Sequence, residues 1–134
     1  MRIDRQAIYD KCNGHCAYCG TPITLKQLGV DHVWPQHFSE YLPIGSDINS
    51  TNNLLPACKS CNTVKGVYFL DEWRAEISKK ATRLRRISRF ALLLRFGIVE
   101  IVEKPVIFYF ETMGLAMPLY LQTIPPQLKK RRET

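Results

Sequence analysis

Two pairs of cysteines constrain this 134-residue chain more than any other feature of its sequence. Each pair has the form C-x-x-C, and the pairs are Cys16 with Cys19 and Cys58 with Cys61. Two intervening residues let a tight turn aim both sulfurs at one point, so two such turns can supply four thiolates to one tetrahedral Zn²⁺. A redox pair is the alternative for one C-x-x-C taken alone. Together the pairs favour a structural zinc, whose four thiolates would leave no open position for catalysis.

The spacing of the two pairs adds a second constraint. Thirty-eight residues separate Cys19 from Cys58, which is more than a simple zinc ribbon needs. Some other structure must therefore be built between the pairs. Such a short region has little core of its own, so zinc binding would supply folding energy. The fifth cysteine, Cys12, is expected to be a buried or free thiol.

The charge of the chain points to a polyanionic partner. The net charge is +7 and the sequence pI is about 9.3, and nucleic acid is the commonest partner of such proteins. Hydrophobic residues make up 46% of the chain, which is ordinary for one soluble globular domain. No apolar run is long enough to span a membrane, and the opening residues do not resemble a signal peptide. We expect a cytoplasmic protein, in which cysteines serve as metal ligands or free thiols rather than as disulfides.

Composition divides the chain into three parts of one domain over residues 1–134. Residues 1–66 hold every cysteine and histidine, residues 67–97 form a basic helical segment, and residues 98–134 are apolar and β-like. The predicted elements of the first part are a helix capped by Asp4, strands at residues 30–34 and 53–57, a loop at residues 39–52, and a helix over residues 59–65 closed by Gly66. The expected class is α+β.

The basic segment has helical periodicity. Apolar residues recur at spacings of three and four over residues 71–96, with Asp71 as a candidate N-cap and Gly97 as a candidate C′ residue. One helix of that length would be about 39 Å long, so a break near Thr82 or Ser88 is an alternative. The segment carries eight Lys and Arg residues between Trp73 and Arg95 against one acid. This excess favours a phosphate-contacting face over a merely solvated one, and the candidate DNA-binding residues are Arg83, Arg85, Arg86 and Arg89.

The last part of the chain predicts a β-hairpin. Its two arms are residues 98–103 and 106–111, rich in β-branched and aromatic residues and joined across Lys104 and Pro105. We expect this hairpin to provide core for the helical segment. A dimer interface is the alternative, so monomer and homodimer both stay open. The basic tail at residues 129–132 is expected to be disordered.

The polar residues around the two cysteine pairs form an ordered set. Asp31-His32 opens the sequence Asp-His-Val-Trp-Pro, Asn53-Leu54 follows, and Cys61 is succeeded by Asn62, Thr63, Val64, Lys65 and Gly66. In this order and spacing, residues 12–66 resemble the HNH endonuclease family. Residues 31–38 are also similar to the start of the HNH domain in RNA-guided CRISPR nucleases. Small HNH proteins of bacteriophages and mobile elements resemble the chain as well.

The resemblance implies a ββα-metal fold, in which two short antiparallel strands and one helix surround a single divalent ion. It gives each motif position a role. Asp31 and Asn62 would bind the catalytic metal, and His32 would be the general base that takes a proton from the attacking water. Asn53 would hold the His32 loop or its imidazole in register. Lys65, one helical turn from Asn62, would contact a phosphate.

The implied activity is metal-dependent hydrolysis of DNA phosphodiester bonds, by nicking or by double-strand cleavage, leaving a 3′-hydroxyl and a 5′-phosphate. An imidazole with a pKa near 6.5 suits the base, and a hard ion with few protein ligands suits the developing charge. Asn62 stands where many family members have histidine, which makes the chain an HNN variant. An amide oxygen predicts a preference for Mg²⁺ or Mn²⁺ and less tolerance of Zn²⁺ or Ni²⁺ at this site.

Two other functions are compatible with parts of the sequence. A zinc-stabilised DNA-binding module with a vestigial centre would have no need for a base beside a metal ligand, so the retained set Asp31, His32, Asn62 and Lys65 favours the nuclease. A toxin nuclease would carry receptor-binding or translocation segments, and no such segment is recognisable. His37 could reach a phosphate or the ion, although a solvent-exposed histidine is the favoured reading.

Overall fold

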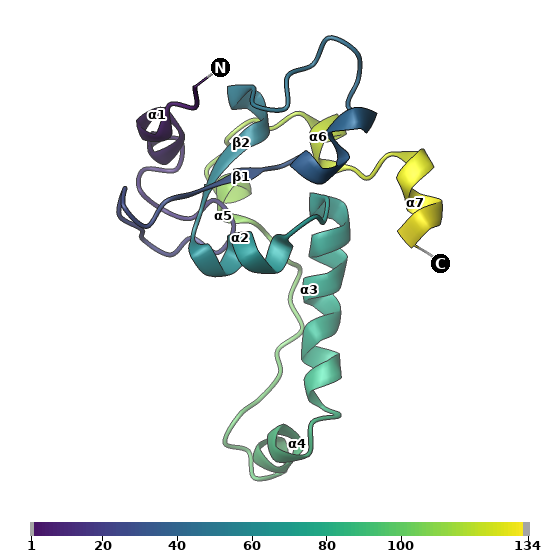
Figure 1. Ribbon diagram of the computed structural model, residues 1–134. Helices are drawn as coiled ribbons and strands as arrows, with labels where there is room; N and C mark the ends of the chain where they lie inside the picture. Colours follow the sequence, from purple (N-terminus) through teal and green to yellow (C-terminus); the bar gives the residue numbers. More distant parts are fainter. Residues whose placement is uncertain (1, 133–134) are drawn as a thin grey trace.

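The computed structural model describes residues 2–132, and its centre is a two-stranded antiparallel sheet with a short helix packed against it (Figure 1). The strands are β1 (Gly29–His32) and β2 (Leu54–Ala57), and the helix is α2 (Lys59–Lys65). Asp31 lies opposite Leu55 in the register. This is the ββα arrangement that the sequence predicts, and the α+β class is confirmed.

The N-terminal helix α1 (Arg5–Asp10) begins as predicted. The Asp4 carboxylate accepts a hydrogen bond from the backbone N–H of Ala7 at 3.1 Å, which satisfies one of the unpaired donors at the helix start. Ile8 is buried beneath the helix. At the other end, the Lys11 ammonium donates to the Leu54 carbonyl at 2.7 Å and so joins the helix to β2.

Both ends of α2 are fixed by the residues that the sequence indicated. The Cys58 sulfur accepts the backbone N–H of Cys61 at 3.3 Å, so a candidate zinc ligand also caps the helix. Gly66 follows with a φ of 50°, a conformation that favours glycine, and its N–H donates to the Asn62 carbonyl. The predicted loop before β2 holds two 3₁₀ turns, η1 (Gln36–Tyr41) and η2 (Thr51–Asn53).

The basic segment forms two helices, α3 (Leu70–Leu84) and α4 (Ser88–Arg95), so the chain breaks where the alternative placed the break. α3 begins one residue earlier than predicted, and Asp71 is not its cap: the Glu72 carboxylate accepts the N–H of Phe69, while Asp71 accepts the N–H of Ile124. The two helices form an arm that projects from the rest of the molecule (Figure 1).

The predicted hairpin at residues 98–111 is wrong. Residues 98–108 form no strand and run back beside α3 to the one-turn helix α5 (Tyr109–Thr112) (Figure 1). The backbone N–H groups of Tyr109 and Phe110 donate to the carbonyls of Tyr18 and Ala17, at 3.1 and 2.8 Å. The segment therefore satisfies its backbone against the first cysteine turn, which removes the need for a partner strand of its own.

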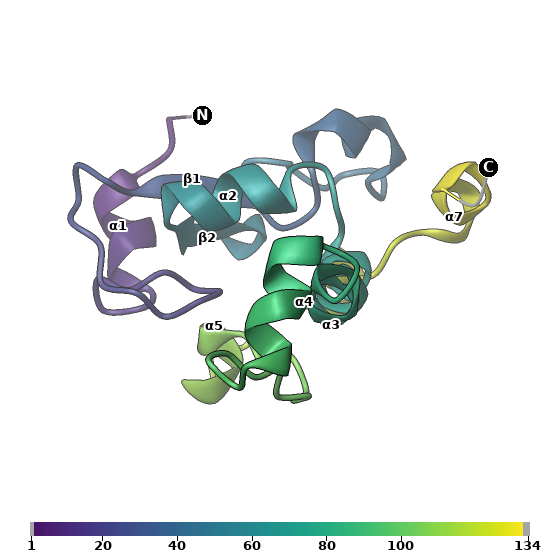
Figure 2. The same cartoon turned by 90° about the horizontal axis from the view of Figure 1, so that it is seen from below.

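The C-terminal helices are α6 (Leu119–Gln122) and α7 (Pro126–Arg132). Helix α7 lies at one side of the molecule (Figure 2). The predicted disorder of residues 129–132 is therefore wrong. The buried Leu128 anchors this part of the chain. It belongs to one hydrophobic core cluster that begins at Cys12 and includes Trp34 and Trp73. Among the described residues, no helix is long and apolar enough to cross a membrane.

Candidate active site

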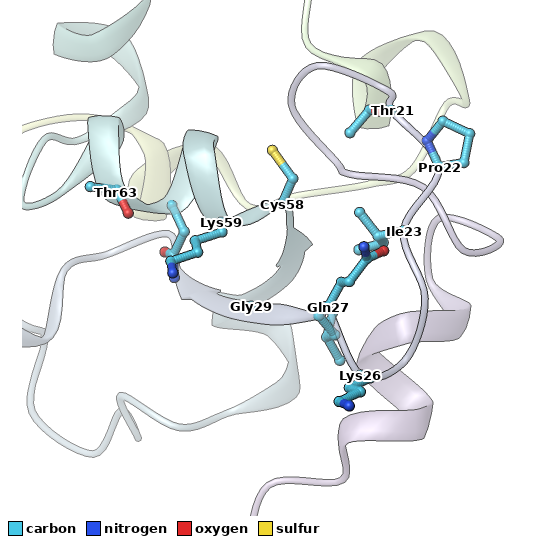
Figure 3. Close-up of a pocket in the computed structure, with 11 residues that line it drawn as sticks. Thr21, Pro22, Ile23, Lys26, Gln27, Gly29, Cys58, Lys59 and Thr63 are labelled. Atoms are coloured by element: carbon cyan, nitrogen blue, oxygen red, sulfur yellow. The ribbon is translucent and has the colours of Figure 1, made fainter.

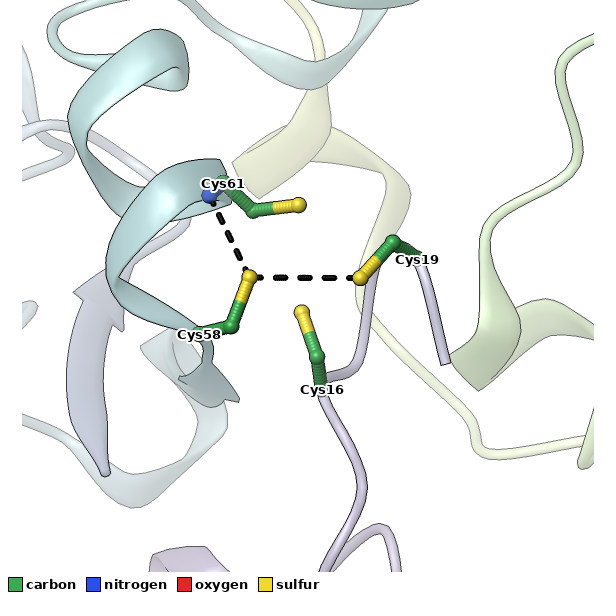
Figure 4. Close-up of side chains that lie close together, drawn as sticks. All are labelled: Cys16, Cys19, Cys58 and Cys61. Atoms are coloured by element: carbon green, nitrogen blue, oxygen red, sulfur yellow. Dashed lines mark hydrogen bonds between the residues drawn. The ribbon is translucent and has the colours of Figure 1, made fainter. Parts of the chain in front are cut away.

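The four paired cysteines lie together between the first cysteine turn and the start of α2 (Figure 4). Their sulfurs all lie within 4.8 Å of one another, and those of Cys19 and Cys58 are 3.9 Å apart. A tetrahedral Zn²⁺ with Zn–S bonds of ~2.3 Å would need sulfurs about 3.8 Å apart. The cluster therefore fits a zinc ion in position and in ligand type.

Hydrogen bonds to the sulfurs of this cluster favour the thiolate form of cysteine. The N–H of Tyr18 points to the Cys16 sulfur at 3.4 Å, as that of Cys61 does to Cys58. The pKa of Cys16 is lowered to about 4, chiefly by a hydrogen bond from the Cys61 thiol, against the opposing effect of burial. Thiolates are the metal-binding form of cysteine. Cys12 lies buried outside the cluster, and burial raises its pKa to about 11, so it is the buried free thiol that was expected.

Asp31 is a buried carboxylate, 4% exposed, on the inward side of β1. It accepts a hydrogen bond from the Tyr18 hydroxyl, and its Oδ2 lies 3.1 Å from the ammonium of Lys65. Burial raises the pKa of Asp31, and the positive charge of Lys65 opposes that rise. The ammonium of Lys65 therefore offsets part of the cost of burying this carboxylate in an apolar setting.

Lys65 does not occupy the place that sequence reasoning gave it. The residue is on α2, one turn from Asn62, but its side chain is fully buried. The ammonium donates to Asp31 and, at 3.0 Å, to the backbone carbonyl of His32. The predicted contact of Lys65 with a phosphate does not fit this position, because a buried ammonium that balances a buried carboxylate is not free to meet a ligand at the surface.

The His32 imidazole is partly exposed and is oriented by a residue that sequence reasoning did not select. Its Nε2 lies 2.8 Å from Oδ1 of Asn49. An amide oxygen only accepts hydrogen bonds, so a proton is assigned to Nε2 and a neutral ring keeps its lone pair on Nδ1. The backbone of Asn49 is held in turn by the Asp47 carboxylate at 2.9 Å. In the sequence, the only indication of this role of Asn49 is its amide side chain, in a loop rich in turn-forming residues.

Asn53 acts on the backbone on either side of this loop. It is 1% exposed, and its Oδ1 accepts the N–H of Trp34 at 2.7 Å. Its Nδ2 donates to the carbonyls of Trp34 and Ile48, at 3.2 and 2.9 Å. Asn53 therefore ties the segment after His32 to the segment that carries Asn49. Of the two expected alternatives, it holds the loop and not the imidazole.

A cleft of about 260 Å³ brings three of the predicted residues together: Asp31, His32 and Asn62 all line it, with His37 among the other lining residues. Asn62 comes from α2, and it approaches β1 closely at Gly29. A Cβ on Gly29 would lie 3.1 Å from Nδ2 of Asn62 and from the Ala57 carbonyl. The donors gathered here, carboxylate and amide oxygens beside an imidazole, are of the type that a hard divalent ion takes.

The four arginines chosen as DNA-binding candidates lie near the far end of the arm, away from the cleft (Figure 1). Arg83 forms an ion pair with Glu76, so part of its charge is neutralised. Arg85, Arg86 and Arg89 are exposed, and within residues 2–132 no acidic group forms an ion pair with them. α3 has 15 residues, which places its end about 22 Å from its start.

Comparison with known proteins identifies the region that holds both the cysteine cluster and the cleft. Residues 16–67 match the family model described as HNH endonuclease. The CRISPR-associated endonuclease Cas9 of Corynebacterium diphtheriae is 37% identical over 54 residues, which are 40% of this chain and 4% of that protein. The SPbeta prophage-derived protein YoqL of Bacillus subtilis, named as an HNH endonuclease, is 28% identical over 95 residues, covering 70% of this chain and 41% of that one.

A solved structure is also similar to the chain. It is the Type II-C Cas9 enzyme from Actinomyces naeslundii, with 26% identity and a TM-score of 0.45. The similarity covers 60% of this chain and 9% of that one. The chain therefore spans less than half the length of each of these relatives.

Proposed function

We propose that this chain is a metal-dependent endonuclease that hydrolyses phosphodiester bonds in DNA, because residues 16–67 match the family model described as HNH endonuclease. The observation that carries the proposal is the cleft lined jointly by Asp31, His32 and Asn62. These residues come from β1 and α2, separated by 30 residues of sequence, and they bring a base and two oxygen ligands to one place.

The proposed roles follow from the chemistry of each side chain. Asp31 and Asn62 would hold Mg²⁺ or Mn²⁺, which when bound offsets the charge that develops on the phosphate oxygens. His32 takes a proton from the attacking water at Nδ1, the ring nitrogen left without a hydrogen by its contact with Asn49. Asn49 and Asn53 are positioning residues, the first for the imidazole and the second for the backbone around it.

The cysteine cluster has a separate role in this proposal. Four thiolates fill the coordination of a zinc ion, so the ion stabilises the fold and takes no part in hydrolysis. It connects the first cysteine turn to α2, and α2 is the helix that carries Asn62. Loss of zinc would therefore displace a proposed ligand of the catalytic metal.

The arm is proposed to contact DNA through Arg85, Arg86 and Arg89, with Arg83 contributing less because Glu76 neutralises part of its charge. A distance of about 22 Å along α3 corresponds to roughly six base pairs at ~3.4 Å each. The arginines would thus contact phosphates remote from the cleavage point. Reversing the charges of Arg85 and Arg86 is expected to weaken DNA binding and to flatten its salt dependence, and an unchanged salt slope would exclude the arm.

A plasmid assay tests the activity. The protein is incubated with supercoiled plasmid and Mg²⁺ or Mn²⁺, and loss of supercoils is followed on a gel. We expect conversion to nicked or linear DNA that requires the added ion and disappears in His32→Ala. His37→Ala is the matched control, because His37 lines the same cleft and has no assigned role. Cleavage that persists undiminished in His32→Ala would refute the proposed base.

A DNA-binding module without activity is the second candidate. It is favoured by the two partners that the Asp31 carboxylate already has, Tyr18 and Lys65. A metal ion at Asp31 would have to share or displace these contacts. A protein that binds DNA but leaves plasmid intact with every divalent ion tested would support this candidate and exclude the endonuclease.

A further inference from the structure

A second cleft adjoins the candidate active site (Figure 3). It has a volume of about 580 Å³ and lies between the loop of residues 21–28 and the beginning of α2. Asn62 lines both this cleft and the smaller one that holds His32. The two clefts therefore meet at a proposed ligand of the catalytic metal, with β1 running from one to the other. We refer to the larger one as the flanking cleft.

The lining of the flanking cleft favours an anion with an apolar part. Its charged side chains are Lys26 and Lys59, both exposed, and no acidic residue lines it. The two lysines come from opposite sides of Gly29, one from the loop and one from α2 (Figure 3). Apart from Cys58, the other lining residues are uncharged, and they include Thr21, Ile23, Gln27, Leu28 and Thr63. A phosphate joined to a sugar and a base combines these two properties.

We propose that the flanking cleft binds the DNA strand beside the scissile phosphate, with Lys26 and Lys59 contacting backbone phosphates. This inference rests on the proposed function, because the flanking cleft would be a DNA-binding subsite of the same endonuclease. β1 advances about 10 Å from Gly29 to His32 at ~3.3 Å per residue. At an axial rise of ~3.4 Å per base pair, this separation corresponds to roughly three base pairs along the duplex axis. The volume of the flanking cleft lies within the ~300–1,000 Å³ of ordinary ligand sites.

The lysines have a competing explanation, which is local to the cysteine cluster. Cys58 lines the same cleft, and Lys59 follows it in the chain. Four thiolates around Zn²⁺ carry a net charge of about −2, so the two ammonium groups could serve to balance that charge. The two explanations differ in what is lost when the lysines are neutralised. One predicts weaker DNA binding, and the other predicts weaker zinc retention.

The test uses the full chain in a His32→Ala background, so that DNA is bound without being cut. The test variant is Lys26→Gln/Lys59→Gln. Lys129→Gln/Lys130→Gln removes the same charge from exposed lysines of α7, which does not line the cleft. Lys26→Arg/Lys59→Arg keeps the charge in place. Binding of a fluorescein-labelled 20-base-pair duplex is measured by fluorescence anisotropy over a range of salt concentrations, with no added divalent ion or chelator, so that zinc stays bound.

We expect the affinity of Lys26→Gln/Lys59→Gln to fall at least tenfold and its salt slope to become shallower by about 1.8, which is ~0.9 for each lost phosphate contact. The arginine variant should stay within about threefold of the parent protein, and the α7 control should lose less than the test variant. Equal loss in the test and control variants would overturn the proposal, because it would reflect net charge alone. Unchanged DNA affinity with faster zinc release to a chelating dye would assign the lysines to the cysteine cluster and overturn it too.

These outcomes separate the subsite from the activity. A parent protein that cuts plasmid, combined with unchanged affinity in the test variant, overturns the flanking cleft and leaves the endonuclease in place. A second outcome is that the test variant selectively loses DNA binding while the protein with His32 intact never cuts DNA. This outcome supports DNA binding in the flanking cleft and excludes the endonuclease. A chain that binds no DNA at all overturns both.

Discussion

Replacing Lys65 with methionine tests the buried ion pair beneath the candidate active site. The substitution keeps an unbranched apolar side chain as far as Cε and removes the ammonium, which lies 3.1 Å from the Asp31 carboxylate in an environment with no exposed surface. Removing one partner of a buried pair leaves the other as an uncompensated charge, at a typical cost of about 3–5 kcal/mol. A domain of this length unfolds with an entropy of about 0.28 kcal/mol/K, so the expected fall in Tm is roughly 11–18 °C.

The assay is thermal unfolding by circular dichroism with zinc saturating in every sample. Three variants are compared with the wild type: Lys65→Met, Asp31→Asn and the double variant. The double variant has no buried charge at this position, so it should be more stable than either single variant, with a coupling of about 1–3 kcal/mol. A fall in Tm of less than about 4 °C in Lys65→Met, together with additive effects in the double variant, would refute the buried pair.

The pH dependence of Lys65→Met gives a second signature of the same pair. Burial raises the pKa of Asp31, and Lys65 gives the largest opposing effect, so loss of the ammonium lets that pKa rise further. An acid whose pKa is higher in the folded state destabilises the fold above that pKa, and the penalty disappears as pH falls below the unfolded value of ~3.9. The difference in Tm between wild type and variant should therefore shrink on acidification, and zinc binding, common to both, largely cancels in the comparison. A difference that grows towards acid pH would contradict this reasoning.

Three further predictions concern the cleft and the cysteine cluster. Asn49→Ala should lower the cleavage rate by about 10–100-fold with little change in Tm. Asn49→Asp still accepts a hydrogen bond from Nε2 of His32, so it should recover part of the lost rate. Rates of plasmid nicking by the two variants test this prediction. Gly29→Ala should lower cleavage by a similar factor, because its Cβ would lie 3.1 Å from Asn62 and displace that side chain, and full activity would contradict the close approach. Chelation of zinc should abolish cooperative unfolding, since structural zinc binding of about 10–16 kcal/mol is comparable to the whole ~5–15 kcal/mol stability of a domain. A zinc-free protein with an unchanged melting curve would refute a structural zinc.

The features that could be predicted from the sequence are those fixed by neighbouring residues. The cap at Asp4 depends on an acceptor three residues before an N–H donor. The bounds of α2 depend on Cys58 at one end and on the positive φ of Gly66 at the other. The two C-x-x-C turns likewise carry their geometry within four residues each, and the four-thiolate coordination of zinc predicts that the two pairs meet.

The features that could not be predicted depend on contacts between distant segments. Residues 98–108 have the composition of strands, but Tyr109 and Phe110 pair with the first cysteine turn, some 90 residues earlier. The inward turn of Lys65 depends on the buried carboxylate of Asp31, which lies 34 positions away. Asn49 and Asn53 both lie in the region before β2, and only the fold decides which of the two amides meets the imidazole.

The most direct test of the proposed centre is diffraction from crystals of His32→Ala grown with Mn²⁺, using the anomalous signal of the ion to locate it. The proposed function predicts a peak in the cleft of residues 31, 32 and 62, about 2.0–2.3 Å from a carboxylate oxygen of Asp31 and from Oδ1 of Asn62. A manganese peak elsewhere, with the Asp31 carboxylate bound only to Tyr18 and Lys65, would contradict a shared metal at these two residues.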